Sequence, residues 1–477
     1  MKTAGVVIKE LHGVGPAPEL FAGLCERRGS FFLDSGLESG GLGRFSFVGF
    51  EPFLEFQARG GEITRSTATE RTVFRGEPLV ELRKLGEDYR AMTGGVETEI
   101  PFLGGAVGGF SYEFGAGLER VESRLTDDLS MPDVQFGFYD GVVVFDGKNG
   151  RVFAVANPVA EAPAEEILGR LERAVNGVGR VIPNPPVGAG PTGDAEANRR
   201  VRDNPPDLKS NFSKAEYLRA IGQIKDYIRA GDVYQVNLAQ RFEAALRDHP
   251  YALYRRLRER SPAPFASYLN LGDFQVVSSS PERFLRIRDR RIETRPIKGT
   301  RPRGKTPEDD ARLRAELLAS EKDRAELLMI VDLERNDLGR VCEFGSVNVD
   351  VLFQIEEHPT VFHLVSAVSG RLRGDCDVWD CIRAAFPGGS ITGAPKIRSM
   401  QIIDEIETRR RNWYTGAMGY IGFDGSCDLN IAIRTILCRG GRAYYHVGGG
   451  IVWDSDPESE FQETLDKGRA MRAAVLA

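Results

Sequence analysis

The feature that most constrains the fold is a sharp change of composition after residue 180. Residues 181–211 read VIPNPPVGAGPTGDAEANRRVRDNPPDLKSN, which is rich in Pro, Gly, Asn and charge and has few large apolar side chains. Such a stretch cannot bury enough apolar surface to build a core, so it is typical of an exposed linker. The sequence therefore predicts an N-terminal region over residues 1–180, a linker over 181–211 and a C-terminal region over 212–477.

Both regions mix short apolar runs with amphipathic helical patterns. Residues 214–230 have the clearest helical periodicity, and Gly231 follows at a position where helices commonly end. This mixed order predicts an α+β fold with sheets flanked by helices. The expected helices are 162–175, 214–230, 307–333 and one beginning at 457. The expected strands are 30–33, 45–48, 142–145, 151–156, 233–242, 266–269, 274–278, 284–288, 291–294, 416–423, 429–437 and 443–447.

Composition excludes several classes of function. The net charge is −6, whereas nucleic-acid-binding domains usually carry a basic surplus, so no nucleic-acid partner is expected. No apolar stretch approaches the ~18 residues of a membrane span, and the first residues lack the core of a signal peptide. The 6 cysteines form no CxxC motif and the 5 histidines no HExxH motif, which favours a reduced, cytoplasmic protein without a zinc site.

Two acidic pairs are candidates for metal binding. Asp323 and Glu326 are three residues apart in a helical pattern, as are Glu460 and Glu463, so each pair projects from one helix face. Two such pairs could together bind a hard cation such as Mg²⁺, which prefers carboxylate oxygens. The alternative is that each pair lies on a solvated helix face, and the spacing alone favours this alternative.

Three glycine-rich segments could bring backbone close to a ligand. FPGGSITGAPK (386–396) precedes a helix expected to reach about Glu407, whose first N–H groups could bind an anion. HVGGGIV (446–452) places three glycines after an expected strand, and RPIKGTRPRG (295–304) is a turn-rich stretch containing Lys298. Each segment alone is weak evidence, because glycine turns are usually only turns.

Taken together in chain order, these motifs resemble the chorismate-utilising enzymes, which include the large subunits of anthranilate synthase and aminodeoxychorismate synthase. The resemblance covers 212 to about 471, and it is weaker at 31–36, 43–52 and 104–113. It implies a large single unit made of two mostly antiparallel sheets flanked by helices, the anthranilate synthase component I-like fold. The segments that carry it include DVYQVNLAQRF, SSSPERF, PIKGTRPRG, DLERNDLGRVCEFGSV, FHLVSAVSG, FPGGSITGAPK, GAMGYIGF, IAIRTI and GGGIVWDSDPESEFQET.

The resemblance also implies roles for individual residues. Glu326 and Glu463 are expected to bind Mg²⁺, and Asp323 and Glu460 are expected either to bind the ion as well or to lie next to its ligands. Related enzymes often have Glu at the position of Asp323. His363 is expected near the reacting ring of chorismate. The residues expected to line the chorismate site are Ser390, Thr392, Gly393, Tyr414, Arg434, Gly448, Gly449, Gly450 and Lys467.

Two positions distinguish among the related activities. Isochorismate and salicylate synthases resemble this chain but carry a lysine base where it has Gln235, which cannot deprotonate water. Anthranilate synthases usually read PIAGT where this chain reads PIKGT, so Lys298 resembles the aminodeoxychorismate branch of folate and p-aminobenzoate synthesis. In that branch the lysine is the proposed nucleophile and Glu282 matches the proposed general acid. Anthranilate synthase component I is the alternative activity, and a chorismate-binding protein without turnover is another.

The resemblance finally implies two partners besides chorismate. No glutaminase motif is recognisable in the sequence, so ammonia is expected from a separate glutamine amidotransferase subunit in a heterodimer. Residues comparable to Leu33, Ser35, Arg44, Phe45 and Ser46 bind tryptophan in relatives, so these five are expected to line a tryptophan pocket. Plain packing of a sheet is the alternative for this segment.

Overall fold

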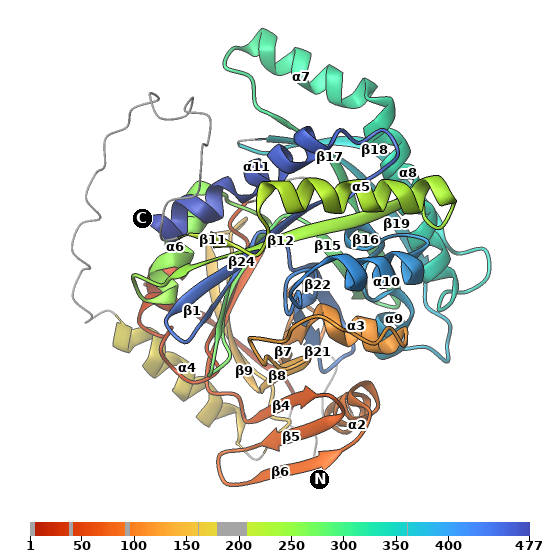
Figure 1. Ribbon diagram of the computed structural model, residues 1–477. Helices are drawn as coiled ribbons and strands as arrows, with labels where there is room; N and C mark the ends of the chain where they lie inside the picture. The colour runs from red at the N-terminus through yellow and green to blue at the C-terminus, as the bar shows by residue number, and fades with distance from the viewer. Residues whose placement is uncertain (1–4, 38–41, 91–95, 161, 179–207, 360) are drawn as a thin grey trace.

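Two large sheets form the body of the protein (Figure 1). The computed structural model describes residues 5–37, 42–90, 96–160, 162–178, 208–359 and 361–477. Strands from both sides of residues 179–207 enter both sheets, and neighbouring strands such as β12 and β24 or β18 and β19 run antiparallel. The predicted α+β architecture of two antiparallel sheets with flanking helices is confirmed.

The first sheet contains the strand with the three consecutive glycines. This strand, β24, pairs with β12 over ten residues, from Val236–Ile451 to Ala245–Arg442. Along the path its strands are β1 (Val7–Leu11), β10 (Arg151–Ala156), β9 (Gly141–Asp146), β3 (Phe45–Gly49), β2 (Phe31–Asp34), β13 (Phe265–Asn270), β14 (Gln275–Ser280), β23 (Thr435–Arg439), β24 (Arg442–Ile451), β12 (Gln235–Ala245) and β11 (Lys209–Ser210), and β20 (Gly393–Ala394) pairs with β12.

The second sheet contains Lys298 and His363. Along the path its strands are β17 (Ile297–Pro302), β19 (Val361–Arg371), β16 (Arg291–Arg295), β15 (Arg283–Arg288), β22 (Cys427–Ile431), β21 (Ala417–Gly422), β7 (Gly105–Phe110), β8 (Val134–Tyr139), β4 (Leu54–Arg59), β5 (Glu62–Ser66) and β6 (Arg71–Arg75), and β18 (Asn348–Glu357) pairs with β19. The chain changes sheet several times, and two of these connections bear on the site: it passes from the first sheet to the second between β14 and β15, and from the second to the first between β22 and β23.

Helices flank the two sheets. The helix predicted at 214–230 is present with the same bounds as α5, because its end signals are local: Ser213 and Glu216 form a capping box, and Gly231 ends the helix at a φ of 84°. The described helices are α1 (Ala17–Ala22), α2 (Pro78–Arg90), α3 (Tyr112–Leu118), α4 (Ala164–Val178), α5 (Lys214–Ala230), α6 (Pro250–Arg260), α7 (Pro307–Ala319), α8 (Glu321–Gly339), α9 (Val378–Ala385), α10 (Lys396–Ile406) and α11 (Pro457–Leu476), with a 3₁₀ turn at Gly389–Ile391.

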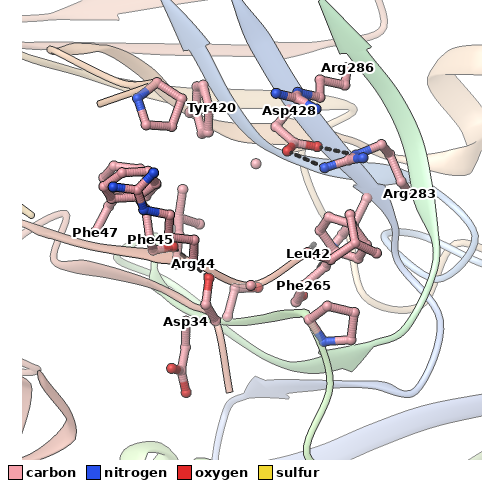
Figure 2. Close-up of a pocket in the computed structure, with 18 of the residues that line it drawn as sticks. Asp34, Leu42, Arg44, Phe45, Phe47, Phe265, Arg283, Arg286, Tyr420 and Asp428 are labelled. Atoms are coloured by element: carbon pink, nitrogen blue, oxygen red, sulfur yellow. Dashed lines mark hydrogen bonds and ion pairs between the residues drawn. The ribbon is translucent and has the colours of Figure 1, made fainter. Parts of the chain in front are cut away.

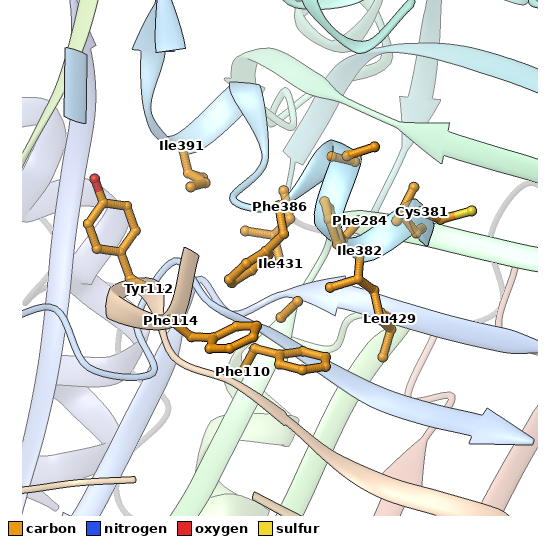
Figure 3. Packing of buried hydrophobic residues seen from close by; sticks show 14 of the residues in the cluster. Phe110, Tyr112, Phe114, Phe284, Cys381, Ile382, Phe386, Ile391, Leu429 and Ile431 are labelled. Atoms are coloured by element: carbon orange, nitrogen blue, oxygen red, sulfur yellow. The ribbon is translucent and has the colours of Figure 1, made fainter. Parts of the chain in front are cut away.

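The glycine-rich loop at 386–396 rests on the hydrophobic core. Phe386 packs against Phe110, Phe114 and Phe284, with ring centroids 5.6–6.4 Å apart (Figure 3). These rings come from β7, α3 and β15, so three elements hold the base of the loop. Burying large aromatic rings in this way contributes strongly to stability, and it fixes the backbone that follows.

Three expectations about elements are wrong. The strand predicted at 429–437 is two strands, β22 and β23, that belong to different sheets, with Arg434 at a left-handed φ of 49° between them. The helix predicted at 307–333 is broken at Ser320, whose side chain caps α8. Residues 297–302 of the supposedly turn-rich stretch form β17, because pairing with β19 outweighs local turn propensity.

Residues 181–207 of the predicted linker lie outside the described residues. Its last residues do not behave as a linker: Leu208 is buried and Lys209–Ser210 form β11 against β12. All 6 cysteines are buried and free. Among the described residues, no helix is long and apolar enough to span a membrane.

Candidate active site

Lys298 is placed by a β-bulge. The register of β17 against β19 shifts between Lys298 and Thr300, and Gly299 between them has a φ of 77°. A Cβ at Gly299 would lie 2.8 Å from Leu317 and 2.9 Å from Asp323, so only glycine fits there. Bulges re-aim neighbouring side chains, and the local chain geometry thus determines where the lysine points.

The amine of Lys298 is held in a mixed electrostatic environment. Its Nζ donates a hydrogen bond to the carbonyl oxygen of Ser390 at 3.0 Å. Burial lowers the pKa of Lys298, the carboxylates of Glu326 and Glu282 partly offset this, and the cation of Lys467 lowers it further. A lowered pKa increases the fraction of neutral amine, which is the nucleophilic form.

Glu282 lies in the connection between β14 and β15, where only 4% of it is exposed. Burial raises the pKa of Glu282 to about 6, although the Ser390 hydroxyl and the Lys298 ammonium oppose the rise. A carboxyl group with such a pKa can donate a proton near neutral pH. The observed environment therefore suits the predicted role of an acid.

Arg434 lies in the connection between β22 of the second sheet and β23 of the first. Its guanidinium makes no hydrogen bond or ion pair with any described residue. Burial lowers the pKa of Arg434, and the Glu282 carboxylate opposes this. Arg434 is partly buried, and a partly desolvated guanidinium without a partner is stabilised when an anion binds to it, so Arg434 is suited to hold a carboxylate of the substrate.

The predicted acidic residues come from two helices. Glu326 lies on α8, and Glu460 and Glu463 lie on α11. A Cβ built on Gly449 would lie 3.5 Å from Glu460 and 3.8 Å from both Glu463 and Lys467. Helix α11 therefore brings Glu460 and Glu463 toward the glycine strand, and Glu326 of α8 is connected to Glu460 through the ammonium of Lys322.

The carboxylate oxygens of Glu326, Glu460 and Glu463 are ligands of the type that a hard cation such as Mg²⁺ prefers. The Lys322 ammonium lies 3.3 Å from a carboxylate oxygen of Glu460 and 4.0 Å from one of Glu326. The space between these two carboxylates is therefore suited to a positive charge. Burial raises the pKa of Glu326, with Asp323 and Glu460 adding to the rise. Among the described residues no three His, Cys, Asp or Glu side chains are close enough to enclose a metal ion. Binding therefore requires the carboxylates to draw together and Lys322 to move aside.

The remaining charged residues of this group are paired. Asp323 accepts a hydrogen bond from Arg301 at 3.1 Å, on the side of α8 that faces β17. Lys467 forms an ion pair with Glu463 at 2.7 Å and donates to the carbonyl of Gly448 at 3.1 Å. The Lys467 ammonium lowers the pKa of Glu463, so this carboxylate is ionised and ready to bind a cation.

His363 lies on β19 and is 2% exposed. Its Nδ1 is 3.0 Å from the hydroxyl of Thr300, whereas its Nε2 has no hydrogen-bond partner among the described residues. Burial lowers the pKa of His363 well below its ordinary value, and Arg434 and His358 add to this. His363 is therefore neutral at physiological pH, with one nitrogen available for a ligand.

The loop at 390–393 contributes mainly backbone groups. The Ser390 carbonyl accepts from both Lys298 and the Asn237 side chain, the latter at 2.9 Å. The Thr392 hydroxyl donates to the carbonyl of Gly388 at 3.0 Å. Gly393 has a φ of 136°, and a Cβ there would lie 2.1 Å from the carbonyl of Gln235. Thr392 and Gly393 thus shape the loop, and Ser390 is the member in contact with the lysine.

The three glycines were expected after a strand, but they lie inside β24. A Cβ at Gly448 would lie 2.5 Å from the carbonyl of Leu238, and one at Gly450 would lie 2.2 Å from the side chain of Gln235. These two glycines allow the close packing of β24 on β12. Gly449 points the other way, toward the carboxylates, so it is the one that opens space for a ligand.

Tyr414 lies in a neighbouring buried cluster. Its ring stacks on His446 at a centroid distance of 4.9 Å, and the guanidinium of Arg411 lies 5.9 Å from it. Arg411 in turn donates to the carbonyl of Ile391 at 3.0 Å. Tyr414 therefore contacts Arg411, and Arg411 holds the loop at 390–393 through its hydrogen bond to Ile391.

A separate cavity of about 450 Å³ lies between the sheets (Figure 2). Four residues of the predicted tryptophan pocket line it, namely Leu33, Ser35, Arg44 and Phe45, but Ser46 does not; its hydroxyl accepts a hydrogen bond from the Ser35 backbone at 3.0 Å. Strands β15, β21 and β22 provide the opposite wall. The residues of that wall are Arg283, Arg286, Arg288, Met418, Gly419, Tyr420, Asp428 and Asn430.

Comparison with known proteins identifies the family. The family model for chorismate binding enzymes matches residues 33–473. The chain belongs to this family. It is 44% identical to aminodeoxychorismate synthase component 1 of Klebsiella aerogenes over 370 residues, covering 77% of this chain and 76% of that protein. It is 39% identical to anthranilate synthase component 1 of Thermus thermophilus over 452 residues, covering 95% and 93%.

The solved structures agree with this assignment of family and fold. Anthranilate synthase component I from Streptococcus pneumoniae superposes with a TM-score of 0.77 at 32% identity, covering 90% of this chain and 92% of that one. The family is thus one of chorismate binding enzymes, and the relatives named above divide between aminodeoxychorismate synthase and anthranilate synthase.

Sequence reasoning missed some residues of both sites. Lys322 is four residues before Glu326 on the same helix, so its position beside that carboxylate could have been expected from the spacing. The Ser390 carbonyl carries no signal in the sequence because it acts through the backbone. Arg286 and Asn430 reach the second cavity through sheet pairing, which no local pattern reveals.

Proposed function

We propose that this chain is the large subunit of an aminodeoxychorismate synthase, which converts chorismate and ammonia to 4-amino-4-deoxychorismate. The observation that carries the proposal is Lys298, whose amine lies among Glu282, Glu326 and Lys467 with a lowered pKa. A lysine on the surface of a turn would keep an ordinary pKa and would have no such neighbours. Anthranilate synthase activity, which adds ammonia at C2 of chorismate, is the alternative.

In the proposed mechanism the reaction consists of two substitutions: Lys298 displaces the C4 hydroxyl, and ammonia then displaces Lys298. The Lys298 amine attacks C2 of the ring, the two ring double bonds shift to C1=C6 and C4=C5, and the C4–O bond breaks while Glu282 gives its proton to the leaving hydroxyl, which departs as water; the Glu282 carboxylate then takes the proton that the alkylated amine releases. Ammonia then bonds to C4 and the C2–N bond breaks, which returns the amine to Lys298. The Arg434 guanidinium and the Gly449 backbone hold the substrate, and the neutral ring of His363 contacts it.

The carboxylates of Glu326 and Glu463 would hold Mg²⁺, with Glu460 and Asp323 beside them. When bound, the ion neutralises and orients a carboxylate of the substrate. The protein's own part is to place cations beside these acids: Lys467 forms an ion pair with Glu463 and lowers its pKa, and Lys322 lies 3.3 Å from Glu460.

The ammonia is proposed to come from a separate glutamine amidotransferase. Relatives that match most of the chain are named component 1, which supports a two-component enzyme. The partner would release ammonia from glutamine and pass it to the site beside Lys298.

One experiment tests these proposals together. The purified chain is incubated with chorismate, Mg²⁺ and either ammonium at high pH or glutamine, and the products are identified by mass. We expect aminodeoxychorismate from ammonium, and none from glutamine until an amidotransferase subunit is added. Anthranilate and pyruvate as products would establish the alternative activity, and unchanged chorismate would refute both. Product from glutamine with this chain alone would refute the separate partner.

The second cavity is proposed to bind tryptophan. Its walls offer aromatic rings at Phe45, Phe47 and Tyr420. They also offer polar groups suited to an amino acid: the Asn430 side-chain oxygen is buried without a partner, and Arg286 makes no hydrogen bond or ion pair with a described residue. The arginine suits a carboxylate and the amide oxygen suits an ammonium group.

A further inference from the structure

A second buried histidine lies beside His363. His358 follows the last residue of β18 directly, and 5% of it is exposed. The rings of His358 and His363 meet edge to face, with centroids 5.0 Å apart and planes at 70°. Such a contact restricts how either ring can rotate.

His363 is also held across the sheet. Its register partner on one side is Thr300 of β17, and on the other side it is Glu356 of β18. Side chains of directly paired residues share one face of a sheet. Thr300 contacts Nδ1 at 3.0 Å, which leaves Nε2 as the nitrogen without a partner among the described residues.

Glu356 supplies a buried negative charge next to these rings. It is 6% exposed, it forms an ion pair with Arg295, and one of its oxygens lies 3.7 Å from His358 Nε2. Burial opposes its ionisation, but His358 and Arg295 outweigh burial and lower the pKa of Glu356. A buried carboxylate persists only when it is paired in this way.

We propose that Glu356 and His358 are positioning residues for His363. Arg295 anchors the Glu356 carboxylate, Glu356 orients the ring of His358, and the edge of His358 fixes the plane of His363 so that Nε2 faces the reacting ring of the substrate. The inference rests on the proposed function, because it needs His363 to contact chorismate.

The charges around His363 predict a pH effect. The basic groups that act on it are Arg434, His358 and Lys467, and each of them disfavours its protonation, as does burial. The only carboxylate facing it from its paired strands is Glu356 among the described residues. Removing the basic ring of His358 therefore raises the pKa of His363, so that on acidification the neutral form is lost at a higher pH.

The test compares Glu356→Gln and His358→Phe with Glu357→Gln. Glu357 is the next residue on β18, but its side chain is 54% exposed and pairs with Arg314, so it is a matched control. We expect kcat to fall about tenfold in the first two variants, with little change in KM, and the acidic limb of the pH profile to move to higher pH in His358→Phe. A kcat equal to that of Glu357→Gln would overturn the inference.

A second measurement does not depend on turnover. The chain has 5 histidines, so nitrogen NMR of labelled histidine gives a small set of rings, and His363→Gln identifies the relevant one. We expect the His363 ring to stay neutral in wild type and to titrate closer to its ordinary value of 6.5 in His358→Phe. An unchanged titration would refute the link between the rings.

The outcomes separate the two proposals. Wild-type protein that leaves chorismate unchanged refutes the proposed function, while the NMR comparison still decides the link between the histidines. If His358→Phe does not fold, Thr300→Val removes the contact to Nδ1 instead. That variant is expected to lower kcat with little change in KM, and an unchanged kcat would count against the positioning of His363.

Discussion

Burial shifts the pKa values of the two titratable groups that the proposed reaction needs in opposite directions. It lowers the pKa of Lys298 and raises that of Glu282, so one site stabilises a neutral amine and a protonated acid together. Both forms are uncharged, and a cavity that excludes water favours uncharged forms. The chemistry therefore depends on how deeply the two side chains are buried as well as on their identity.

Replacing Lys298 separates a covalent from an electrostatic role. Lys298→Ala should lower kcat at least about 10²-fold with a much smaller change in KM, because Arg434 and the glycine strand still hold the substrate. Lys298→Arg should fail as well, since a guanidinium stays protonated and cannot attack. Substantial ammonia-dependent activity in Lys298→Arg would contradict the covalent mechanism while leaving the assignment of the enzyme intact.

Glu282 should cost the protein stability at neutral pH. Its pKa rises from 4.5 to about 6 on folding, so the folded state favours the protonated form, and stability falls as the pH rises through about 6. This shift in the pKa of Glu282 lowers the free energy of unfolding by ~2 kcal/mol above that pH. Glu282→Gln should therefore be inactive but more stable than wild type at pH 8, and equally stable at pH 4. Urea unfolding at both pH values measures this, and a loss of stability at pH 8 would contradict it.

The acids on α11 allow a paired test of metal binding. Glu463→Gln removes a carboxylate that points at Gly449, whereas Glu458→Gln removes an exposed one that pairs with Lys214 at 2.6 Å. We expect the Mg²⁺ concentration for half-maximal activity to rise about tenfold or more only in Glu463→Gln. An unchanged requirement in both variants would remove Glu463 from the metal site.

At the scale of elements, local signals were readable from the sequence and non-local ones were not. The bounds of α5 were predicted because its cap and its terminal glycine lie next to it in the chain. β17 was taken for turns because its pairing with the distant β19 is what makes it a strand. The change of sheet at Arg434 depends on a left-handed backbone conformation that no neighbouring residue requires.

Two glycines, one inside α5 and one directly after its last residue, should respond in opposite ways to the same substitution. Gly231 ends the helix at a φ of 84°, and a Cβ there would meet no atom within 4 Å, so Gly231→Ala costs about 1 kcal/mol through backbone strain alone. Gly222 lies inside the helix, also with free space, so Gly222→Ala should stabilise by about 0.5–1 kcal/mol. Thermal unfolding of the two variants measures both, and shifts of the same sign would contradict the assignment of the helix end.

At the scale of the whole molecule, the active site and the second cavity lie at the same crossing between the sheets. Glu282 belongs to the active site and Arg283 lines the second cavity, although the two residues are neighbours in the chain. Arg283 is fixed by Asp428 at 2.9 Å and by Glu293 at 2.7 Å. A ligand that moves Arg283 would therefore also move Glu282, which gives a physical route from one site to the other.

The final prediction tests what the second cavity holds. A ligand that binds only the folded protein at 100 times its Kd stabilises it by about 2.7 kcal/mol, so tryptophan should raise the Tm in a concentration-dependent way. Arg286→Met should abolish the effect of tryptophan if the arginine binds its carboxylate. Indole lacks that carboxylate, so any shift it causes should be the same in wild type and variant. No shift with tryptophan over a wide concentration range would mean that this cavity only reflects the packing of the two sheets.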